Sequence, residues 1–324
     1  EPIGYLKVVT LGESTLSAEE LTSIAGNLAN GAVIDLGEAT FATTEFPMDF
    51  ARKTNLQEIA LPRNIQTFAS EAYSGAFYNC TNLKRVTLPE GLTAIGANCF
   101  RQCSQLESIE LPSSVRTLDI YAFYGCKSLT SVVIPEGVEA IPRFIFDSCT
   151  ALTDVTLPST LKSIGTEAFE ATGLKEITIP ESVTSVEAAV FKNCKSLERI
   201  QFPDALTAIP ANLCNACSAL TTINMPSKLE TVGNDAFYNC GKLQDVTFPE
   251  TLKSLDERSF GGCSAFTRII IDIPAIANYA FWNCANVTSI DLGEKVTSIG
   301  RNTFIMADNL QTITCRAKNV PSLG

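Results

Sequence analysis

Residues 83–103 read LKRVTLPEGLTAIGANCFRQC and residues 106–126 read LESIELPSSVRTLDIYAFYGC, so one pattern recurs after 23 positions. The same interval separates most members of a set of nine cysteines: Cys80, Cys103, Cys126, Cys149, Cys194, Cys217, Cys240, Cys263 and Cys284. The longest interval spans two repeats, and Thr172 stands where a cysteine would be. A period of this length is typical of a solenoid, in which each coil buries its apolar face against its neighbours.

The other columns of the repeat predict a structure for each part of a coil. The unit reads L-x-x-I-x-L-P-x-x-L-x-x-I-x-x-x-x-F-x-x-C-x-x. Its Ile-x-Leu step alternates with period 2 and predicts a short strand, which the following proline ends because it has no N–H. This segment occurs about twelve times, from Leu56–Leu61 to Leu310–Cys315, so stacked coils would form a parallel sheet of about 12 short strands. The looser L-x-x-I-x-x-x-x-F segment predicts a short helical or irregular return wall.

This repeat resembles the leucine-rich repeats of the BspA-like family of bacterial surface proteins, and the resemblance covers residues 55–315. It implies an α/β-type repeat solenoid, a right-handed leucine-rich-repeat superhelix built from 23-residue repeats. It also implies a secreted or cell-surface protein that adheres to host extracellular matrix proteins or to bacterial surface proteins.

The two ends of the chain depart from the repeat. Residues 1–54 are predicted to form an N-terminal cap, and residues 55–324 the solenoid. Ser17-Ala18-Glu19-Glu20 fits a capping box at the start of a helix that Gly31 could stop, and Val33–Leu36 could be a first strand pairing with Leu56–Leu61. After Cys315 the sequence stops before another Phe-x-x-Cys segment, so the last coil is expected to be incomplete.

Irregular repeats mark local changes in the coils. Four extra residues lie around Ser70–Gly75, and the turn at Asp272–Ile273 is two residues short. Such insertions and deletions are expected in loops, where they are either tolerated variation or recognition points.

Composition excludes several classes of function. The 324 residues include 35 acidic and 24 basic side chains, a net charge of −11, which argues against binding to nucleic acid or anionic membranes. The chain has no histidine, which removes Ser-His-Asp and Cys-His catalysis and histidine-containing zinc sites. No apolar run approaches the ~18 residues of a transmembrane helix. No signal peptide is visible, although one could have been removed before Glu1. We therefore expect no enzyme, cofactor or metal site.

The cysteines allow a chemical and a structural interpretation. Cys214-x-x-Cys217 has the spacing of a redox or zinc pair, but Cys214 replaces the repeat phenylalanine and Cys217 is the repeat cysteine. The structural interpretation is therefore favoured. Bridging stacked cysteines would distort the coils, so we predict a ladder of buried reduced thiols, with all twelve cysteines structural.

Binding is expected at outward positions, because the inward ones are committed to the core. The two outward columns of each strand make a flat face of mixed polarity, which is typical of surfaces that bind proteins. Its predicted binding residues are Arg85, Glu110, Asp154, Glu176, Arg199, Asp245 and Arg268. These residues predict a non-enzymatic adhesion protein, against the simpler interpretation of a solvated sheet rich in β-favouring threonines.

A second outward column directly follows the repeat phenylalanine. Its aromatic members are Tyr78, Tyr124, Tyr238 and Trp282. Exposed tyrosine and tryptophan are common binding anchors, so this column predicts a glycan-binding module as the alternative function. The same rings could instead only cover the edge of the coils, and the whole chain could be a structural spacer within a larger surface protein.

Overall fold

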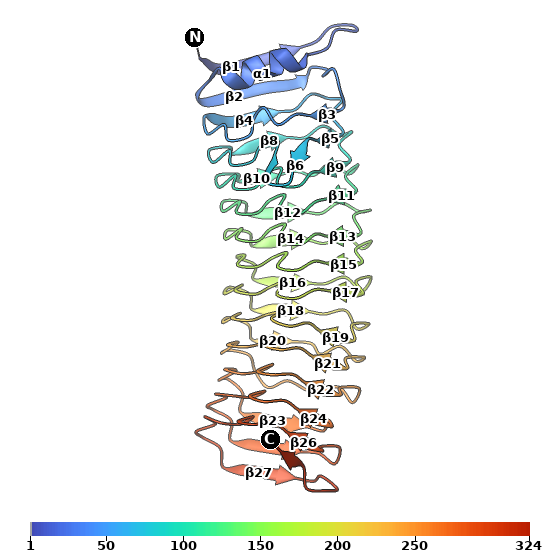
Figure 1. Cartoon of the computed structure of the whole chain (residues 1–324), viewed down its shortest axis with the longest axis vertical. Coiled ribbons are helices and arrows are strands. Elements are labelled where there is room, and N and C mark those ends of the chain that lie inside the picture. The colour runs from blue at the N-terminus through green and yellow to red at the C-terminus, as the bar shows by residue number, and fades with distance from the viewer. Residues whose placement is uncertain (1) are drawn as a thin grey trace. The chain divides into compact units, whose positions relative to one another are not determined.

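The computed structural model of the chain describes residues 2–324, which divide into unit 1, up to Leu161, and unit 2, from Lys162 to Gly324. Within each unit, short strands of successive coils lie in two ladders, each of which is divided into short sheets of parallel strands (Figure 1). We call the ladder of the Ile-x-Leu segments the first ladder, and the ladder of the L-x-x-I segments the second ladder. The boundary between a cap of residues 1–54 and a solenoid of residues 55–324 remains a prediction.

The first ladder of unit 1 contains β1 (Ile3–Val9), β2 (Leu28–Glu38), β4 (Leu56–Ala60), β8 (Arg85–Thr87), β10 (Ser108–Ile109), β12 (Ser131–Val133) and β14 (Asp154–Thr156). Its second ladder contains β3 (Glu45–Phe46), β5 (Thr67–Phe68), β9 (Ala94–Ile95), β11 (Thr117–Leu118) and β13 (Ala140–Ile141). The strands of unit 1 follow the repeat from β4 onward, and the N-terminal segment adds β1, β2 and β3 before it. Ile59 lies opposite Val86, and Val86 lies opposite Ile109, so equivalent core residues stack in register.

Unit 2 repeats this arrangement. Its first ladder contains β16 (Glu176–Thr178), β18 (Arg199–Gln201), β20 (Thr222–Ile223), β23 (Arg268–Ile271), β25 (Ser289–Leu292) and β27 (Thr312–Cys315). Its second ladder contains β15 (Ser163–Ile164), β17 (Ser185–Val186), β19 (Ala208–Ile209), β21 (Thr231–Val232), β22 (Ser254–Leu255), β24 (Ala275–Ile276), β26 (Ser298–Ile299) and β28 (Ser322–Leu323). Because β28 pairs with β26, the segment after Cys315 returns to the second ladder.

The return wall of the coils was predicted to be irregular or helical, whereas the structure has the short parallel strands of the second ladder there. Two-residue strands such as β9 and β11 pair in parallel, with Thr117 opposite Ala94 and Leu118 opposite Ile95. The constant length of the coil brings equivalent residues about 4.8 Å apart, where their backbone N–H and C=O groups pair instead of remaining unsatisfied.

One predicted strand of the first ladder, Asp245–Thr247, is absent from unit 2. Asp245 Oδ1 accepts hydrogen bonds from the backbone N–H of Thr267 (2.7 Å) and of Arg268 (3.2 Å). Asp245 Oδ2 accepts a third from the Thr267 hydroxyl (2.7 Å). The side chain therefore takes backbone donors that a regular ladder would use, which is a known way for Asp to compete with a strand.

The N-terminal segment combines a helix with two long strands. Helix α1 (Ala18–Gly26) begins at Ser17, whose hydroxyl accepts from the Glu20 N–H at 3.2 Å while Glu20 accepts from the Ser17 N–H at 2.8 Å. The helix ends at Gly26, so the expectation that Gly31 stops it is wrong; Gly31 lies within β2 at φ +75°. β2 contains the predicted strand and pairs with β4, whereas β1, which pairs with β2, is not anticipated by the repeat.

A column of stacked phenylalanine rings fills the core. In unit 1, Phe100 stacks on Phe77 and on Phe123 with ring centroids 5.4 Å apart in both pairs, and all three are fully buried. In unit 2, Phe260 stacks on Phe237 at 5.1 Å and on Phe281 at 5.8 Å. The repeat phenylalanine therefore acts as the anchor of each coil.

The turn around this phenylalanine has a fixed backbone, which we call the Phe turn. In most coils the residues two before and two after the ring both adopt left-handed φ angles, as Asn98 (φ 56°) and Gln102 (φ 64°) do around Phe100; around Phe77 only Asn79 (φ 58°) does. The same angles flank Cys214, at Asn212 (φ 58°) and Ala216 (φ 61°). The turn therefore keeps its shape even where the ring is replaced, and it presents the neighbouring positions at the surface.

Candidate functional site

The outward columns of the first ladder form the predicted binding face, and each unit is described separately. In unit 1, Arg85, Glu110 and Asp154 are exposed on β8, after β10 and on β14. Inward neighbours such as Val86 and Ile109 are buried. The period-2 alternation of the strand thus places these side chains as the sequence predicts, with charges outward and apolar groups inward.

Charges on this face pair between successive coils of unit 1. Arg85 Nη1 lies 3.7 Å from Glu58 Oε2, and the two residues are direct partners in the pairing of β4 with β8. Both side chains are more than a third exposed, so the pair contributes little to stability and stays accessible to a ligand.

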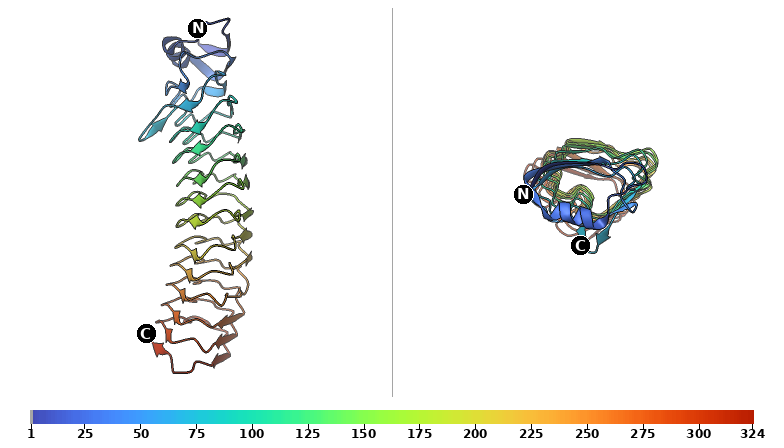
Figure 2. Two further views of the ribbon diagram at one scale, coloured as in Figure 1. Left: turned by 90° about the vertical axis from the view of Figure 1, so that its right-hand side faces the viewer. Right: turned by 90° about the horizontal axis from the view of Figure 1, so that it is seen from above.

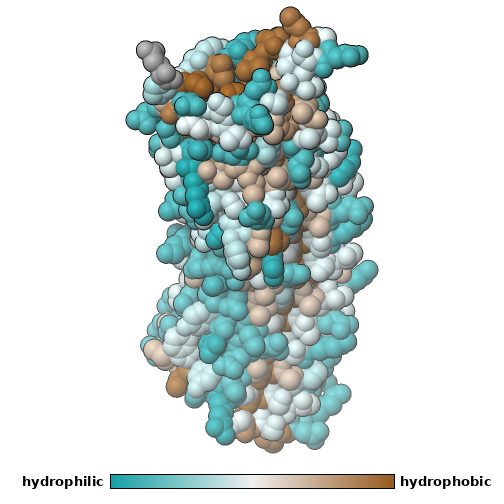
Figure 3. All heavy atoms as spheres, turned by 45° about the horizontal axis from the view of Figure 1, so that its top comes forward, coloured by the Kyte–Doolittle hydropathy of each residue, from teal (hydrophilic) through white to brown (hydrophobic). Residues whose placement is uncertain are grey.

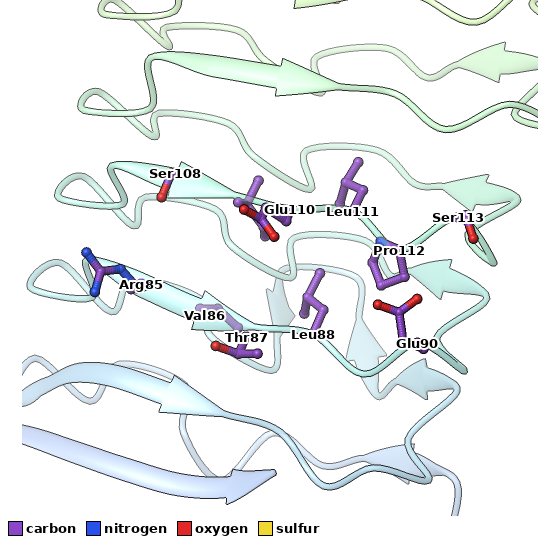
Figure 4. Close-up of a pocket in the computed structure, with 11 residues that line it drawn as sticks. Arg85, Val86, Thr87, Leu88, Glu90, Ser108, Glu110, Leu111, Pro112 and Ser113 are labelled. Carbon is purple, nitrogen blue, oxygen red and sulfur yellow. The ribbon is translucent and has the colours of Figure 1, made fainter.

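The face of unit 1 contains a hollow of about 540 Å³ over β8 and β10. Figure 4 shows Arg85 at the start of β8, Glu110 just after β10, and Glu90 with Pro112 farther along the coils. Basic and acidic groups therefore lie at different places in one hollow, over a floor that includes Val86 and Leu88. This arrangement fits a polar, extended ligand better than a compact apolar one.

The face of unit 2 carries its own ion pairs. Arg199 Nη1 lies 3.7 Å from Glu176 Oε2. Asp291 Oδ2 lies 3.8 Å from Arg268 Nη2 and 2.8 Å from Arg316 Nη2, so one carboxylate serves two guanidiniums. Asp245, also a predicted binding residue, is exposed and has both carboxylate oxygens bonded to the next coil.

Several exposed apolar side chains were not singled out as site residues. Val133 on β12 is 63% exposed and Ile270 on β23 is 52% exposed, each on the face of its own unit. Near the N-terminus, Tyr5, Val9 and Leu11 are exposed. Figure 3 shows apolar residues at the surface of this end. The signal for Val133 and Ile270 was an apolar residue at an outward strand position.

The aromatic column lies at the Phe turns, and its four predicted members are half-buried. In unit 2, Tyr238 and Trp282 stack with ring centroids 6.1 Å apart and planes 14° apart. They lie two coils apart, and Gly261 of the intervening coil leaves room, since a Cβ there would be 3.1 Å from Tyr238 Cδ2. In unit 1, Tyr78 and Tyr124 both lie beside the guanidinium of Arg101.

The repeat cysteines are free thiols buried beside the phenylalanine column. Each donates its S–H to the carbonyl one coil earlier, as Cys103 does to Phe77 at 3.1 Å and Cys217 to Phe191 at 3.0 Å. Burial raises the pKa of the Cys80 thiol to about 12 and that of the Cys214 thiol well above its ordinary value. Protonated, hydrogen-bonded thiols are poor nucleophiles, which supports the structural interpretation of Cys214-x-x-Cys217.

Cys315 differs from the other cysteines. It lies on β27, opposite Leu292 of β25, at a position that is apolar and buried in other coils. All four residues of β27 are exposed, and Cys315 with them. The expectation of a uniformly buried ladder therefore does not extend to this residue.

In residues 2–324, no helix combines the length and the apolar character needed to cross a membrane.

Stacked 23-residue coils, parallel ladders and the L-x-x-I-x-L column define a leucine-rich-repeat solenoid. The sequence matches the family described as BspA type leucine rich repeat region at residues 70–198, 118–242 and 207–324, which together span more than half of the chain. The protein belongs to this family. A search of curated proteins found no match.

Solved structures of similar proteins agree with this assignment. A leucine-rich repeat protein from Bacteroides ovatus is 26% identical with a TM-score of 0.62, over 80% of this chain and 69% of that one. A leucine rich cell surface protein from Faecalibacterium prausnitzii is 27% identical with a TM-score of 0.56, over 90% of each chain. The pneumococcal vaccine antigen PcpA is 18% identical with a TM-score of 0.51, over 90% of this chain and 79% of that one, and shares the fold alone.

Proposed function

We propose that this protein is a non-enzymatic adhesion protein, at the cell surface or secreted, that binds host matrix or bacterial surface proteins through the first-ladder face. The observation that carries the proposal is the composition of that face. Its inward side chains are committed to the core, while the outward ones combine weak ion pairs with the exposed Val133 and Ile270. Such a rigid, pre-formed surface loses little conformational entropy on binding, which favours multipoint contact with a protein.

Membership in the BspA-type family and the likeness to a cell surface protein of Faecalibacterium prausnitzii support the location and the binding role. The absence of histidine from the sequence agrees with a role that needs no acid–base catalysis.

The test is binding of the purified chain to arrayed matrix and bacterial surface proteins. Arg199→Ala and Ile270→Ala should each weaken a true face-mediated interaction about tenfold, since interface anchors contribute that much or more. Lys253→Ala, which removes an exposed ion pair with Glu230 outside the face columns, is the matched control and should leave binding unchanged. Binding that survives both face variants would contradict the proposal, and a protein that binds nothing on the array would favour a spacer.

A second candidate function, glycan binding, is favoured by the parallel stack of Tyr238 and Trp282. The planes of the two rings are nearly parallel, and Gly261 has no side chain that would separate them. Together the rings present a flat, half-buried surface. Loss of glycan binding in Trp282→Ala, with protein binding retained, would establish this function instead.

A further inference from the structure

Arginine and aromatic side chains alternate along the Phe turns of unit 1. The Arg101 guanidinium carbon lies 4.9 Å from the ring centroid of Tyr121, 5.2 Å from that of Tyr124 and 5.9 Å from that of Tyr78. Arg52 lies on Tyr78 at 5.5 Å. These distances are those of cation–π contacts, so the five side chains form one continuous stack.

The stack continues into the next coil. Tyr121 stacks on Phe144 with ring centroids 4.9 Å apart and planes 5° apart, and Arg143 lies over Phe144 at 6.0 Å. We call Arg52, Tyr78, Arg101, Tyr121, Tyr124, Phe144 and Arg143 the Arg–Tyr ladder.

The guanidiniums of this ladder have no carboxylate partner among the described residues of unit 1. The ion pairs of that unit are those of Lys7 and Arg85. Arg101 Nη1 donates to Asn98 Oδ1 at 3.1 Å, whereas Arg101 Nε is buried without a hydrogen-bond partner. The chain has a net charge of −11, yet the three arginines of this ladder gather beside aromatic rings and not beside carboxylates.

The backbone under the ladder carries bulky residues in an unfavourable conformation. Arg52 (φ 62°), Tyr121 (φ 58°) and Phe144 (φ 60°) all occupy left-handed positions of the Phe turns. Asn98 occupies the equivalent position one coil before Tyr121, and asparagine tolerates this conformation better than an aromatic residue. Aromatic side chains at these positions therefore strain the turn, and they add ring surface where the core needs none.

A hairpin forms a wall beside the ladder. Strands β6 (Ser70–Glu71) and β7 (Ser74–Gly75) pair in antiparallel fashion and project from the side of unit 1 (Figure 2). The buried Asn98 joins the hairpin to the ladder, because its Nδ2 donates to the Glu71 carbonyl at 3.4 Å while its Oδ1 accepts from Arg101. Tyr73, at the tip, is 81% exposed. The inserted residues thus enlarge the surface next to the free guanidinium edges.

We propose that the Arg–Tyr ladder binds an acidic polysaccharide, whose carboxylate or sulfate groups accept hydrogen bonds from the edges of the guanidiniums. The ring faces contact one another and the arginines. Arg52 and Arg143 are exposed and Arg101 is half-buried, so donors of these guanidiniums other than the buried Arg101 Nε are the groups that a ligand would meet. A guanidinium carries five donors in a planar fork that matches a carboxylate or sulfate, and few of those of Arg101 are used.

The spacing of the cations also fits a linear polymer. Arg52 and Arg101 lie two coils apart, which corresponds to about 10 Å along the stack. Charges repeated at such intervals on a sugar chain can meet successive arginines, whereas a neutral sugar forms no ion pairs with them. The Arg–Tyr ladder shares no residue with the face of the first ladder. The polysaccharide site therefore does not depend on the proposed protein binding.

The test is isothermal titration calorimetry of the full chain at low salt, with heparin, hyaluronan and maltodextrin oligosaccharides of matched length and with polyglutamate. We expect binding to an acidic oligosaccharide, weakened by added salt because exposed charges are screened. Binding to heparin alone would identify sulfate as the recognised group, and binding to hyaluronan as well would show that a carboxylate suffices. Failure of both to bind, or equal binding of maltodextrin or of polyglutamate, would overturn the proposal.

Variants separate the ladder from general charge effects. Arg101→Gln should weaken binding about tenfold or more, and Arg101→Lys should weaken it less, because it keeps the charge but loses the planar fork. Should Arg101→Gln unfold the coil, the exposed Arg52→Gln tests the same stack at its end. Lys253→Gln changes the net charge equally in unit 2 and should leave binding unchanged; an equal loss there would overturn the site.

Discussion

The Phe turns of unit 1 and unit 2 share one backbone conformation but neutralise their charges differently. In unit 1, Arg101 stacks on three tyrosine rings and forms no ion pair. In unit 2, Arg258 donates from Nε and Nη2 to both oxygens of Asp235, at 2.7 Å and 2.9 Å. Lys192 likewise lies 3.2 Å from Glu170. Arg101 of unit 1 is therefore surrounded by rings, whereas Arg258 and Lys192 of unit 2 are each paired with a carboxylate.

This difference separates the parts of the coil that build the fold from those that can change. The phenylalanine, the cysteine and the two left-handed residues shape the turn in both units. The residues beside them have no core partner, so they can carry a stack of rings in one unit and an ion pair in the other at little cost to the core. Three experiments test the comparison.

The largest effect is expected from removing a phenylalanine ring that fills the core behind the turn. Phe100→Ala should lower the free energy of unfolding by about 3–5 kcal/mol, because it opens a cavity between Phe77 and Phe123 and ends both ring stacks. Urea denaturation would measure the loss. Phe100→Leu is the control and should cost less, since it leaves a smaller cavity. A loss below about 1 kcal/mol for the alanine variant would show that the ring column is not the anchor.

The regular part of this fold could be predicted from the sequence because it depends on strict repetition. Columns such as Val86 with Leu88, and Phe100 with Cys103, predict the first ladder and the core directly. The second ladder could not be predicted, since two-residue strands contain no alternation to detect. The missing strand at Asp245 depends on hydrogen bonds to the next coil, which a single repeat does not reveal.

The candidate sites were only partly predictable. The outward positions of Arg85 and Arg199 follow from strand alternation, and the sequence placed Tyr78 and Tyr124 in one column. The connection between those two rings was missed, although Arg101 stands between them in the same column of the sequence. The available signal was an alternation of arginine and tyrosine in successive coils. The sequence could not show that these side chains touch, because that depends on the distances between coils.

A smaller effect is expected from breaking the ion pair of unit 2. The hydrogen bonds to Asp235 raise the pKa of Arg258 above its ordinary value. Arg258→Gln should lower the free energy of unfolding by about 1–3 kcal/mol, because Asp235, whose side chain is only 15% exposed, loses both charged donors. Thermal and urea unfolding would measure this change.

The double variant Arg258→Gln with Asp235→Asn should recover part of the loss, since no uncompensated charge remains. Glu257→Gln is the matched control, because that more exposed partner of Arg258 should contribute at most about 1 kcal/mol. The opposite result would be an unchanged free energy of unfolding in Arg258→Gln and a lowered one in Arg101→Gln. The Arg–Tyr ladder of unit 1 would then stabilise the fold, and the ion pair of unit 2 would not.

The smallest effect is expected at a feature that the two units share. In each, a carboxylate accepts hydrogen bonds from both the N–H and the hydroxyl of a serine in the next coil. Glu136 in unit 1 accepts from the Ser159 N–H and hydroxyl, both at 3.0 Å. Asp204 in unit 2 accepts from the Ser227 N–H at 2.7 Å and its hydroxyl at 2.8 Å. The backbone hydrogen bond, followed by the hydroxyl, holds the pKa of each carboxyl below its ordinary value.

A folded-state pKa below the unfolded value means that the stabilisation is fully present above the ordinary carboxyl pKa of about 4 and is lost as the pH falls through the folded-state pKa. The melting temperature should therefore decline below about pH 4, and Asp204→Asn and Glu136→Gln should each make that decline shallower. Ser182→Ala, which removes a hydroxyl without a hydrogen-bond partner, is a control that should leave the slope unchanged. Both carboxylates accept from the N–H and the hydroxyl of a serine, so the two variants should change the pH dependence of the melting temperature alike. An effect confined to one unit would mean that the chemistry shared by the coils is narrower than their common backbone indicates.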